Sequence, residues 1–595
     1  MFNVKCQLMK NRLLTITLII SLLILSNLQV FSCTNFIITK GASKDGSTMV
    51  TYSADSHTLY GELYYRPAGT YPIGTMMDVI EWDSGKKMGQ IPQATKTYSV
   101  VGNMNEHQLA IGETTYGGLE ALSAPNGIMD YGSLIYITLQ RAKNAREAIK
   151  TISFLLENYG YCSSGESFSI IDPNEAWIFE LIGKGEEMKD AKGKTLKGWT
   201  KGAVWVARRI PDGYISGHAN QSRITTFPLS DGKTSITSKE LDKIFLPTVE
   251  TVYAHDVISF AKLKGLYPAK ALDAEFSFSH TYAPLDFSGA RACEARVWMA
   301  FYRCNPTLMA PYEKYARGED LKSKEKMPLW IKPDHKLSVQ EVMELMRDHY
   351  EGTSMDMTKD IGAGPFACPY RWRPMNWEFE GKKYIHERAT ATQQTGFSFV
   401  AQARGWLPDK FGGVFWFGVD DAASSCYVPI FCGINVIPEE LREGNGSMVE
   451  YSSTAAFWIF TKVSNFAYSR YKDMIIPIKS KQHELESKWV KEIVDMENEM
   501  VQLMNQKPEA AQDKLNSFSI EKTKEMCQTW NDLFIYLLVK YNDGNVKKEE
   551  NGKFVVTDTE VPQCDFPEQP RYSDKWYEII VKDCGPNIIE HAVQE

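Results

Sequence analysis

The sequence predicts an α+β protein, because strand-like runs come in blocks and the helical stretches are grouped between them. A regular alternation of strand and helix would instead place one helical run after each strand. Hydrophobic residues make up 43% of the chain and aromatic residues 12%, as in well-packed globular proteins. A length of 595 residues exceeds what one hydrophobic core supports, so we expect two to four structural units.

The first 32 residues are typical of a secretory signal peptide. A basic start precedes an apolar run over residues 13–25, and Val30-Phe31-Ser32 closes the segment. Signal peptidases accept small or medium residues at the −3 and −1 positions, so we expect cleavage after Ser32. The mature chain then begins at Cys33, and the protein is exported to a periplasmic or extracellular location.

A cysteine at the mature N-terminus carries a thiol and a free α-amine on one residue. The α-amine has an ordinary pKa of about 7.7–8.0, so near neutrality it can accept the proton of its own thiol. Cys33 is therefore a candidate nucleophile that supplies its own base. Three alternatives compete on this segment alone: cleavage elsewhere, a disulfide at Cys33, or a bacterial lipoprotein signal in which Cys33 is acylated and anchors the protein.

Charge and composition exclude several classes of partner. The formal net charge is −8 and no basic cluster stands out, so we expect no nucleic-acid partner. Past residue 33 no apolar run approaches the roughly 20 residues that span a bilayer, so we expect no membrane span. No Cys-x-x-Cys or His-x-x-x-His pair occurs, which argues against zinc. Spacing does not determine disulfide pairing, but three pairs are close enough to be candidates: Cys293/Cys304, Cys426/Cys432 and Cys564/Cys584.

The first elements are predicted by local patterns. Residues 34–40 and 47–53 have strand composition and flank a turn rich in Gly, Ser and Asp, which predicts a hairpin that starts directly after Cys33. Pairing in a ladder would hold Cys33 in place. Helical periodicity over 131–159 follows, and further strand-like runs occur at 97–102, 109–115, 167–171, 176–181, 204–207 and 214–218.

The pattern changes from about residue 335. A short helix over 339–350, a loop-rich stretch over 352–377 and strands within 395–433 are followed by two amphipathic helices separated by Pro508. We therefore predict a signal peptide (1–32), a catalytic core in two parts (33–335 and 336–475) and a C-terminal helical extension (476–595). The last helices either pack on the core or form a subunit contact, which leaves a homo-oligomer open.

Three polar residues are candidates to assist a Cys33 thiolate that attacks an amide. Asp55 follows the second predicted strand and can lie across the hairpin from Cys33, where it would hold the ammonium group. The side-chain amide of Asn220, after the strand at 214–218, can donate to an oxyanion. Arg296 can bind a carboxylate or orient the site. The plainer interpretations are a solvated loop aspartate, a turn asparagine and a surface arginine.

Histidines suggest a Cys–His enzyme as an alternative. His57, His107 and His218 are candidates for its base, but no local pattern links any of them to Cys33.

Several motifs, taken in order, resemble peptidase family C69. The chain opens with Cys33-Thr34-Asn35 and later contains His218-Ala219-Asn220-Gln221-Ser222-Arg223. Similar stretches occur at 42–47, 103–107, 111–115, 206–213, 351–356, 362–366 and 414–429, so the resemblance covers roughly residues 33–470. Members of this family are dipeptidases and N-terminal nucleophile (Ntn) hydrolases. The resemblance implies an αββα sandwich core, no cofactor and a dipeptide substrate.

The resemblance also implies roles for individual residues. Cys33 would be nucleophile and base, Asp55 would hold the amine and Asn220 would be the oxyanion asparagine. Arg296 matches the later family arginine, with Arg291 as the alternative.

One position departs from the wider superfamily. Penicillin and bile-salt acylases carry an arginine shortly before the aspartate, where this chain has Tyr52, which argues against an acylase and leaves the positive partner of the thiol open. Thr115 or Glu113 lies near another polar oxyanion group of the superfamily.

The sequence therefore predicts an exported cysteine dipeptidase that acts through a thioester acyl-enzyme. An enzyme selective for dipeptides must bind both charged chain ends, because a charge buried without a partner is costly. Candidates are Glu113 or the neighbourhood of Asp55 for the ammonium group, and Arg296 or Arg223 for the carboxylate. Two other hypotheses stay open: an Ntn amidase or acylase acting on non-peptide amides, and a lipid-anchored binding protein.

Overall fold

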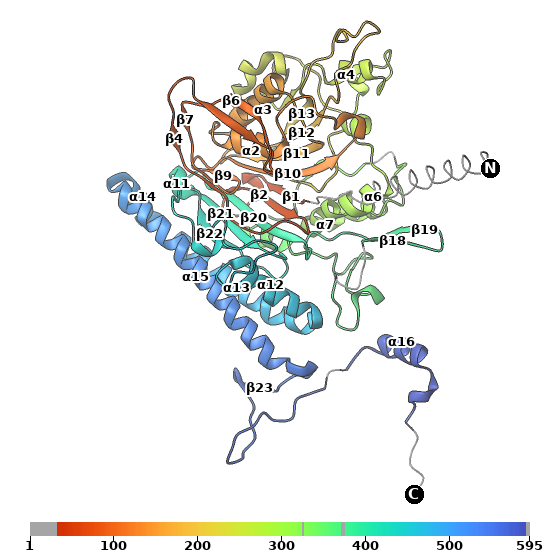
Figure 1. The fold of residues 1–595 in the computed structure, drawn as a ribbon, viewed down its shortest axis with the longest axis vertical. Helices are drawn as coiled ribbons and strands as arrows, with labels where there is room; N and C mark the ends of the chain where they lie inside the picture. Colours follow the sequence, from red (N-terminus) through yellow and green to blue (C-terminus); the bar gives the residue numbers. More distant parts are fainter. Residues whose placement is uncertain (1–32, 324–325, 371–374, 570, 591–595) are drawn as a thin grey trace, which may run out of the picture.

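Two large β-sheets lie face to face, and helices cover both outer faces (Figure 1). The computed structural model describes residues 33–323, 326–370, 375–569 and 571–590. The predicted signal peptide, residues 1–32, lies outside the described residues. The mixed α and β content agrees with the α+β prediction.

The first sheet contains the hairpin that the sequence predicts. β1 and β2 pair antiparallel with Ile37 opposite Val50, and a bridge between Thr34 and Ser53 continues the pairing towards Cys33. Strands from both predicted parts of the core join this sheet. Its seven strands, in spatial order, are β17 (Trp330–Ile331), β14 (Ile215–His218), β1 (Asn35–Ile38), β2 (Thr48–Asp55), β20 (Thr395–Ala403), β21 (Gly413–Val419) and β22 (Val428–Phe431).

The second sheet packs against β1 and β2 through its strands β10 and β11. The two sheets approach closely at Gly112, where an added β-carbon would lie 2.7 Å from the side-chain amide of Asn35. Its nine strands, in spatial order, are β15 (Ser235–Thr237), β16 (Thr251–Tyr253), β13 (Ala203–Arg209), β12 (Ala176–Gly183), β11 (Gly165–Ile171), β10 (Ala110–Gly117), β9 (Met104–Asn105), β8 (Val100–Val101) and β3 (Tyr65–Arg66).

Two helices cover the outer face of the second sheet, α2 (Tyr131–Leu139) and α3 (Ala145–Tyr159). The periodic stretch 131–159 is therefore interrupted. Asn144 adopts an extended conformation and its side chain accepts a hydrogen bond from the backbone of Glu147, which starts the second helix.

Helices of the C-terminal half cover the outer face of the first sheet (Figure 1). They include α7 (Ala295–Cys304), α10 (Val339–Leu345), α12 (Ala456–Ala467) and α15 (Pro508–Lys540). Pro508 occupies the first turn of α15, where no N–H is needed, and the predicted helix before it is divided into α13 (Tyr471–Asp495) and α14 (Glu497–Gln506).

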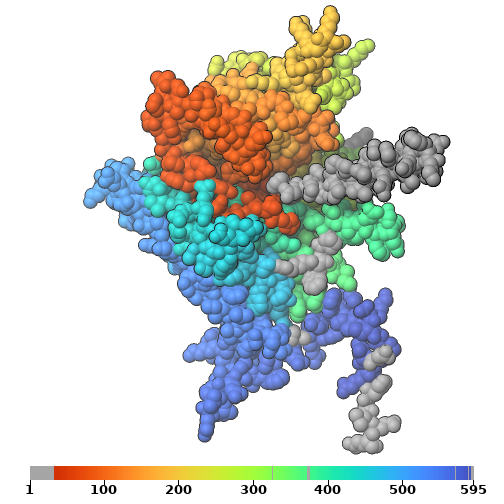
Figure 2. Space-filling view, in the orientation of Figure 1, coloured from red at the N-terminus to blue at the C-terminus, as the bar shows by residue number. Residues whose placement is uncertain are grey.

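The long helix α15 packs on the core. It lies against β22, and the buried ring of Trp530 stacks on Phe460 of α12 with centroids 4.6 Å apart. The segment beyond α15 extends away from the body of the protein (Figure 2), and its helix α16 (Asp574–Cys584) buries no residue. No helix among the described residues is long and apolar enough to cross a bilayer.

The proposed disulfides are not formed. No disulfide bond joins any of the ten cysteines among the described residues. Cys293 and Cys304 lie eleven positions apart on two consecutive helical segments. The rise along the helix axis therefore separates them by about 16 Å. A strand separates Cys426 from Cys432 by roughly 20 Å. Both distances exceed the reach of a disulfide.

Candidate active site

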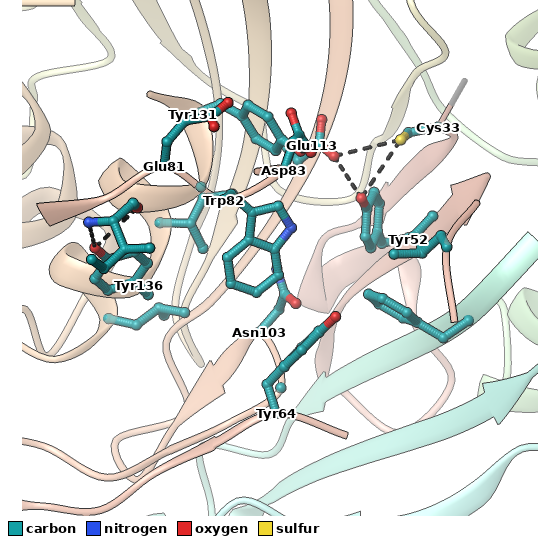
Figure 3. A pocket seen from close by; sticks show the side chains of 18 of the residues that line it. Cys33, Tyr52, Tyr64, Glu81, Trp82, Asp83, Asn103, Glu113, Tyr131 and Tyr136 are labelled. Carbon is teal, nitrogen blue, oxygen red and sulfur yellow. Dashed lines mark hydrogen bonds between the residues drawn. The ribbon is translucent and has the colours of Figure 1, made fainter. Parts of the chain in front are cut away.

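Cys33 lies at one end of a cavity of about 850 Å³ (Figure 3). The walls come from the strands around Cys33, from α2 and from the hairpin formed by β5 (Met76–Ile80) and β6 (Lys87–Pro92). Aromatic and acidic side chains are prominent in the lining: Tyr52, Tyr64, Trp82, Tyr131, Tyr136 and Phe397, and Asp55, Asp78, Glu81, Asp83 and Glu113.

Side chains from two distant segments fix the backbone of Cys33, which is 5% exposed. Its nitrogen donates to Oδ1 of Asn220 over 2.9 Å. Its carbonyl oxygen accepts from Nη1 of Arg296 over 2.7 Å. These two hydrogen bonds hold the backbone of Cys33 at its nitrogen and at its carbonyl oxygen, and so fix the position of the thiol.

Asn220 follows β14 in a left-handed backbone conformation, with φ = 56°. Asparagine tolerates this region better than most residues. Oδ1 faces two donors, the Cys33 nitrogen and Nη2 of Arg296, while Nδ2 donates to the carbonyl of Thr115 over 2.7 Å. The atom that meets Cys33 is thus Oδ1, whereas the expected oxyanion donor, Nδ2, is bound to Thr115.

Arg296 lies on α7 with its side chain fully buried. Besides Cys33 it binds Oγ1 of Thr34 over 2.7 Å and Oδ1 of Asn220 over 2.9 Å. It does not line the cavity. The alternative, Arg291, forms an ion pair with Glu387. Of the two, Arg296 is the one that contacts Cys33.

The thiol faces two polar side chains (Figure 3). Sγ lies 3.5 Å from Oη of Tyr52 and 3.4 Å from Oε1 of Glu113. Burial raises the pKa of the thiol well above its ordinary value, and the charges of Glu113 and Asp55 raise it further, while hydrogen bonds from Tyr52 and the Asp55 backbone act in the opposite direction. At neutral pH the thiol is protonated, so it needs a base.

Glu113 and Glu166 form a buried carboxyl pair behind the thiol. Tyr52 donates to Oε1 of Glu113, and Thr115 donates to Oε1 of Glu166, each over 2.5 Å. The two Oε2 atoms find no donor among the described residues, and the two side chains bond to each other. Burial and the charge of Glu113 hold the pKa of Glu166 well above its usual range, and burial also raises the pKa of Glu113.

Asp55 lies beside the thiol at a bulge of β2. Its carboxylate accepts from Nη2 of Arg388 over 2.7 Å and from Oγ1 of Thr395 over 2.6 Å. The Cys33 nitrogen is instead bound by Asn220. Arg388 interacts electrostatically with both Cys33 and Asp55, and no sequence pattern had indicated it.

Two of the predicted substrate-binding residues use their side chains elsewhere. Arg223 forms an ion pair with Glu294 over 3.0 Å, donates to three backbone carbonyls and does not line the cavity. Thr115 lines the cavity, but its hydroxyl donates to Glu166. The geometry therefore gives no support to Arg223 as a ligand of the substrate carboxylate, because its guanidinium is bound to Glu294 and to backbone carbonyls of β14 and of the segment just before β17.

The histidines do not form a Cys–His pair in the described structure. His218 is buried against Glu180 over 2.9 Å, His107 pairs with Asp409 over 2.9 Å, and the cavity lining contains no histidine. The described residues also hold no group of three His, Cys, Asp or Glu side chains arranged for a metal ion.

The cavity residues that sequence analysis missed come mostly from residues 64–136. Tyr64, Trp82, Asp83 and Tyr131 all line the cavity, and Tyr64 packs edge-on against Phe397 of β20. They are ordinary aromatic and acidic residues without a distinctive spacing, so the sequence offers no signal for them.

Comparison with known proteins gives a consistent result. A family model for peptidase family C69 matches residues 32–484. A probable dipeptidase from Salmonella dublin is 24% identical over 439 residues, covering 68% of this chain and 82% of the relative. A probable dipeptidase from Latilactobacillus sakei is 23% identical over 462 residues, covering 75% and 82%. A dipeptidase from Bifidobacterium longum is 22% identical over 446 residues, covering 69% and 73%.

Proposed function

Because the chain belongs to peptidase family C69, we propose that it is an exported dipeptidase in which Cys33 begins the mature chain and acts as both nucleophile and base. The main support is the position of Cys33. Its nitrogen and its thiol both lie in the polar network at the end of the cavity, and the family match begins at residue 32. The names of the relatives, dipeptidase or probable dipeptidase, support the substrate class.

The layered fold supports an Ntn-hydrolase core. Two facing sheets with helices on both outer faces have the αββα order expected of that class. Residues 33–335 and 336–475 contribute strands to the same sheet, which fits one core in two parts. Residues 476–595 form the helical extension, anchored by α15 on β22.

Catalysis begins with proton transfer inside Cys33. Removal of residues 1–32 turns the nitrogen that faces Oδ1 of Asn220 into an α-amine, and Asn220 orients it towards the thiol. The amine takes the thiol proton, and the thiolate attacks the substrate carbonyl carbon to give a tetrahedral oxyanion. The ammonium then returns its proton to the leaving amine as the C–N bond breaks, which leaves a thioester on Cys33.

Hydrolysis of the thioester reverses these roles. The free α-amine takes a proton from water, the resulting hydroxide attacks the thioester, and the released thiolate recovers the proton. Asp55, held by Arg388, stabilises the transient ammonium through its charge. Asn220 serves the oxyanion when its Nδ2 exchanges the carbonyl of Thr115 for the substrate oxygen.

The alternatives make different demands on Cys33. A lipid anchor needs an exposed cysteine, whereas Cys33 is 5% exposed and its thiol faces Glu113. An amidase for non-peptide amides does not need charged groups that recognise chain ends.

Intact-mass measurement of the exported protein, combined with a dipeptide assay, tests the proposal. We expect a first residue Cys33 without a lipid increment, and a Ser32→Arg variant that is neither processed nor active. Another N-terminus on the active protein, or a diacylglyceryl mass, would contradict it.

A further inference from the structure

The cavity is rich in carboxylates, and Asp55 and Asp78 are held in ion pairs with Arg388 and Lys87. Among the described residues that line it, Arg66 is the single cation, and it pairs with Glu443 over 2.9 Å. Asp78 pairs with Lys87 over 2.9 Å. Glu81 accepts hydrogen bonds from the backbone and hydroxyl of Ser84 and closes its own turn.

Three lining carboxylates, Glu81, Asp83 and Glu113, form no ion pair within the described structure. Of these, Glu81 is engaged by its own turn, whereas Asp83 and Glu113 lie on the same side of the cavity (Figure 3). Glu113 is only 3% exposed, and the two groups within hydrogen-bond distance of its Oε1, the Tyr52 hydroxyl and the Cys33 thiol, bring no positive charge. Its Oε2 has no hydrogen-bond partner among the described residues. Burial is the main cause that raises the pKa of Glu113, and the nearby charge of Asp83 raises it further, so the two carboxylates repel each other when both are ionised. A cation between them would remove this repulsion.

The structure holds Asp83 in place before any ligand binds. Oη of Tyr131, the first residue of α2, donates to Oδ1 of Asp83 over 2.7 Å. The neighbouring Trp82 donates its backbone N–H to Oδ2 of Asp130 over 3.0 Å, and its side chain packs where Gly132 has no β-carbon. The turn of the β5–β6 hairpin is therefore anchored to the start of α2, and Asp83 is preorganised.

Glu113 lies at the distance from the nucleophile that an α-ammonium group requires. In a peptide the α-nitrogen of the first residue is about 2.5 Å from the carbonyl carbon of the same residue. A group that binds this nitrogen must lie close to the attacking sulfur, and Oε1 of Glu113 is 3.4 Å from Sγ of Cys33.

We propose that Asp83 and Glu113 together bind the α-ammonium group of the substrate's N-terminal residue, with Tyr131 as the residue that positions Asp83. An ammonium group has three N–H donors, which two carboxylates and a hydroxyl oxygen can accept. The inference rests on the proposed function and specifies its substrates: peptides with a free N-terminal amine whose first peptide bond is cleaved.

Matched substrates and matched variants test this inference. One dipeptide is assayed with a free and with an acetylated N-terminus on the processed wild-type enzyme, on Asp83→Asn and on Asp78→Asn. Asp78 lies on the same hairpin and lines the same cavity, but it is already paired with Lys87. We expect the wild-type enzyme and Asp78→Asn to prefer the free dipeptide by at least 100-fold in kcat/KM.

Asp83→Asn should reduce this preference at least tenfold, mainly through a higher KM for the free dipeptide. Tyr131→Phe should likewise raise the KM for the free dipeptide, with little change in kcat. The rate at which iodoacetamide alkylates Cys33 should stay the same in Asp83→Asn, which shows that the site is folded.

Two results would overturn the inference while leaving the proposed function in place: equal rates of the wild-type enzyme on the free and acetylated dipeptide, or an unchanged preference in a folded Asp83→Asn variant. Full activity of Cys33→Ala would instead overturn the proposed function itself. The two failures are therefore distinguishable.

Discussion

The carbonyl oxygen of Cys33 accepts a 2.7 Å hydrogen bond from Nη1 of Arg296, a residue 263 positions later in the chain. The same guanidinium binds Oδ1 of Asn220, which in turn accepts from the Cys33 nitrogen. One buried arginine thus links both backbone groups of the nucleophile to the asparagine that faces it. The segment that leads from Cys33 into β1 cannot shift without breaking these hydrogen bonds.

Replacement of Arg296 by lysine should lower kcat about 100-fold, because an ammonium group cannot reproduce the planar fork and a displacement of about 1 Å has this effect on rate. Thermal denaturation should show a lower Tm, since buried acceptors lose their donor at a cost of about 1–3 kcal/mol each. Arg303→Lys is the matched control, because Arg303 lies on the same helix in a partly exposed pair with Asp348. Equal losses in both variants would argue against an orienting role for Arg296.

Replacement of Cys33 should remove activity without unfolding the protein. We expect Cys33→Ala to abolish hydrolysis and Cys33→Ser to retain at most a small fraction, because an alkoxide forms far less readily than a thiolate near neutral pH. Iodoacetamide should inactivate the wild-type enzyme, and a metal chelator should not. Cys564→Ser, at an exposed free thiol, serves as the control. Loss of activity in EDTA would speak strongly against this mechanism.

The pH dependence of alkylation should report the charge of Glu113. That charge raises the pKa of the Cys33 thiol, so its removal in Glu113→Gln should lower the thiol pKa. The alkylation profile then moves to lower pH, and at a fixed pH near 7 the variant reacts faster than wild type. Dipeptide hydrolysis should fall in the same variant, because the ammonium group loses a partner. The exposed Glu120→Gln is the control, and a profile shifted to higher pH would disprove the assignment.

Binding of the substrate's C-terminal carboxylate should depend on Arg66. Among the described lining residues it is the cation that the cavity offers, whereas Arg223 and Arg296 are bound inside the protein. Amidation of a good dipeptide should lower kcat/KM by about 100-fold, at ~1.4 kcal/mol per tenfold. Arg66→Gln should reduce this difference at least tenfold, and Lys87→Gln should not. An unchanged difference in Arg66→Gln would exclude this residue.

Local patterns predicted the elements whose signals are local. The hairpin of β1 and β2 follows from β-branched runs on either side of a tight turn, and the buried strand β20 from its apolar residues. The boundary between α2 and α3 was missed because one capping side chain, Asn144, outweighs a continuous apolar periodicity.

The residues of the candidate site also fall into two groups: those that a local pattern indicates, and those that only the fold brings together. Cys33 is visible in the sequence because a predicted signal peptide and a predicted strand meet there. Arg388 and Asp83 are not, since each acts through a partner far away in the chain or through a turn anchored on another element. Arg223 shows the opposite error: it stands in a recognisable motif, but its guanidinium faces Glu294.

The family, the mixed α and β character and the cysteine just before the first strand follow from local sequence, because composition, order of motifs and hydrophobic periodicity are properties of neighbouring residues. The polar groups that meet Cys33 depend instead on the folded chain. A chain of contacts between separate strands and loops links the thiol to its own backbone nitrogen. It runs through Glu113, Glu166, Thr115 and Asn220. The energies of those contacts depend on burial and distance in the folded chain, which no local pattern encodes.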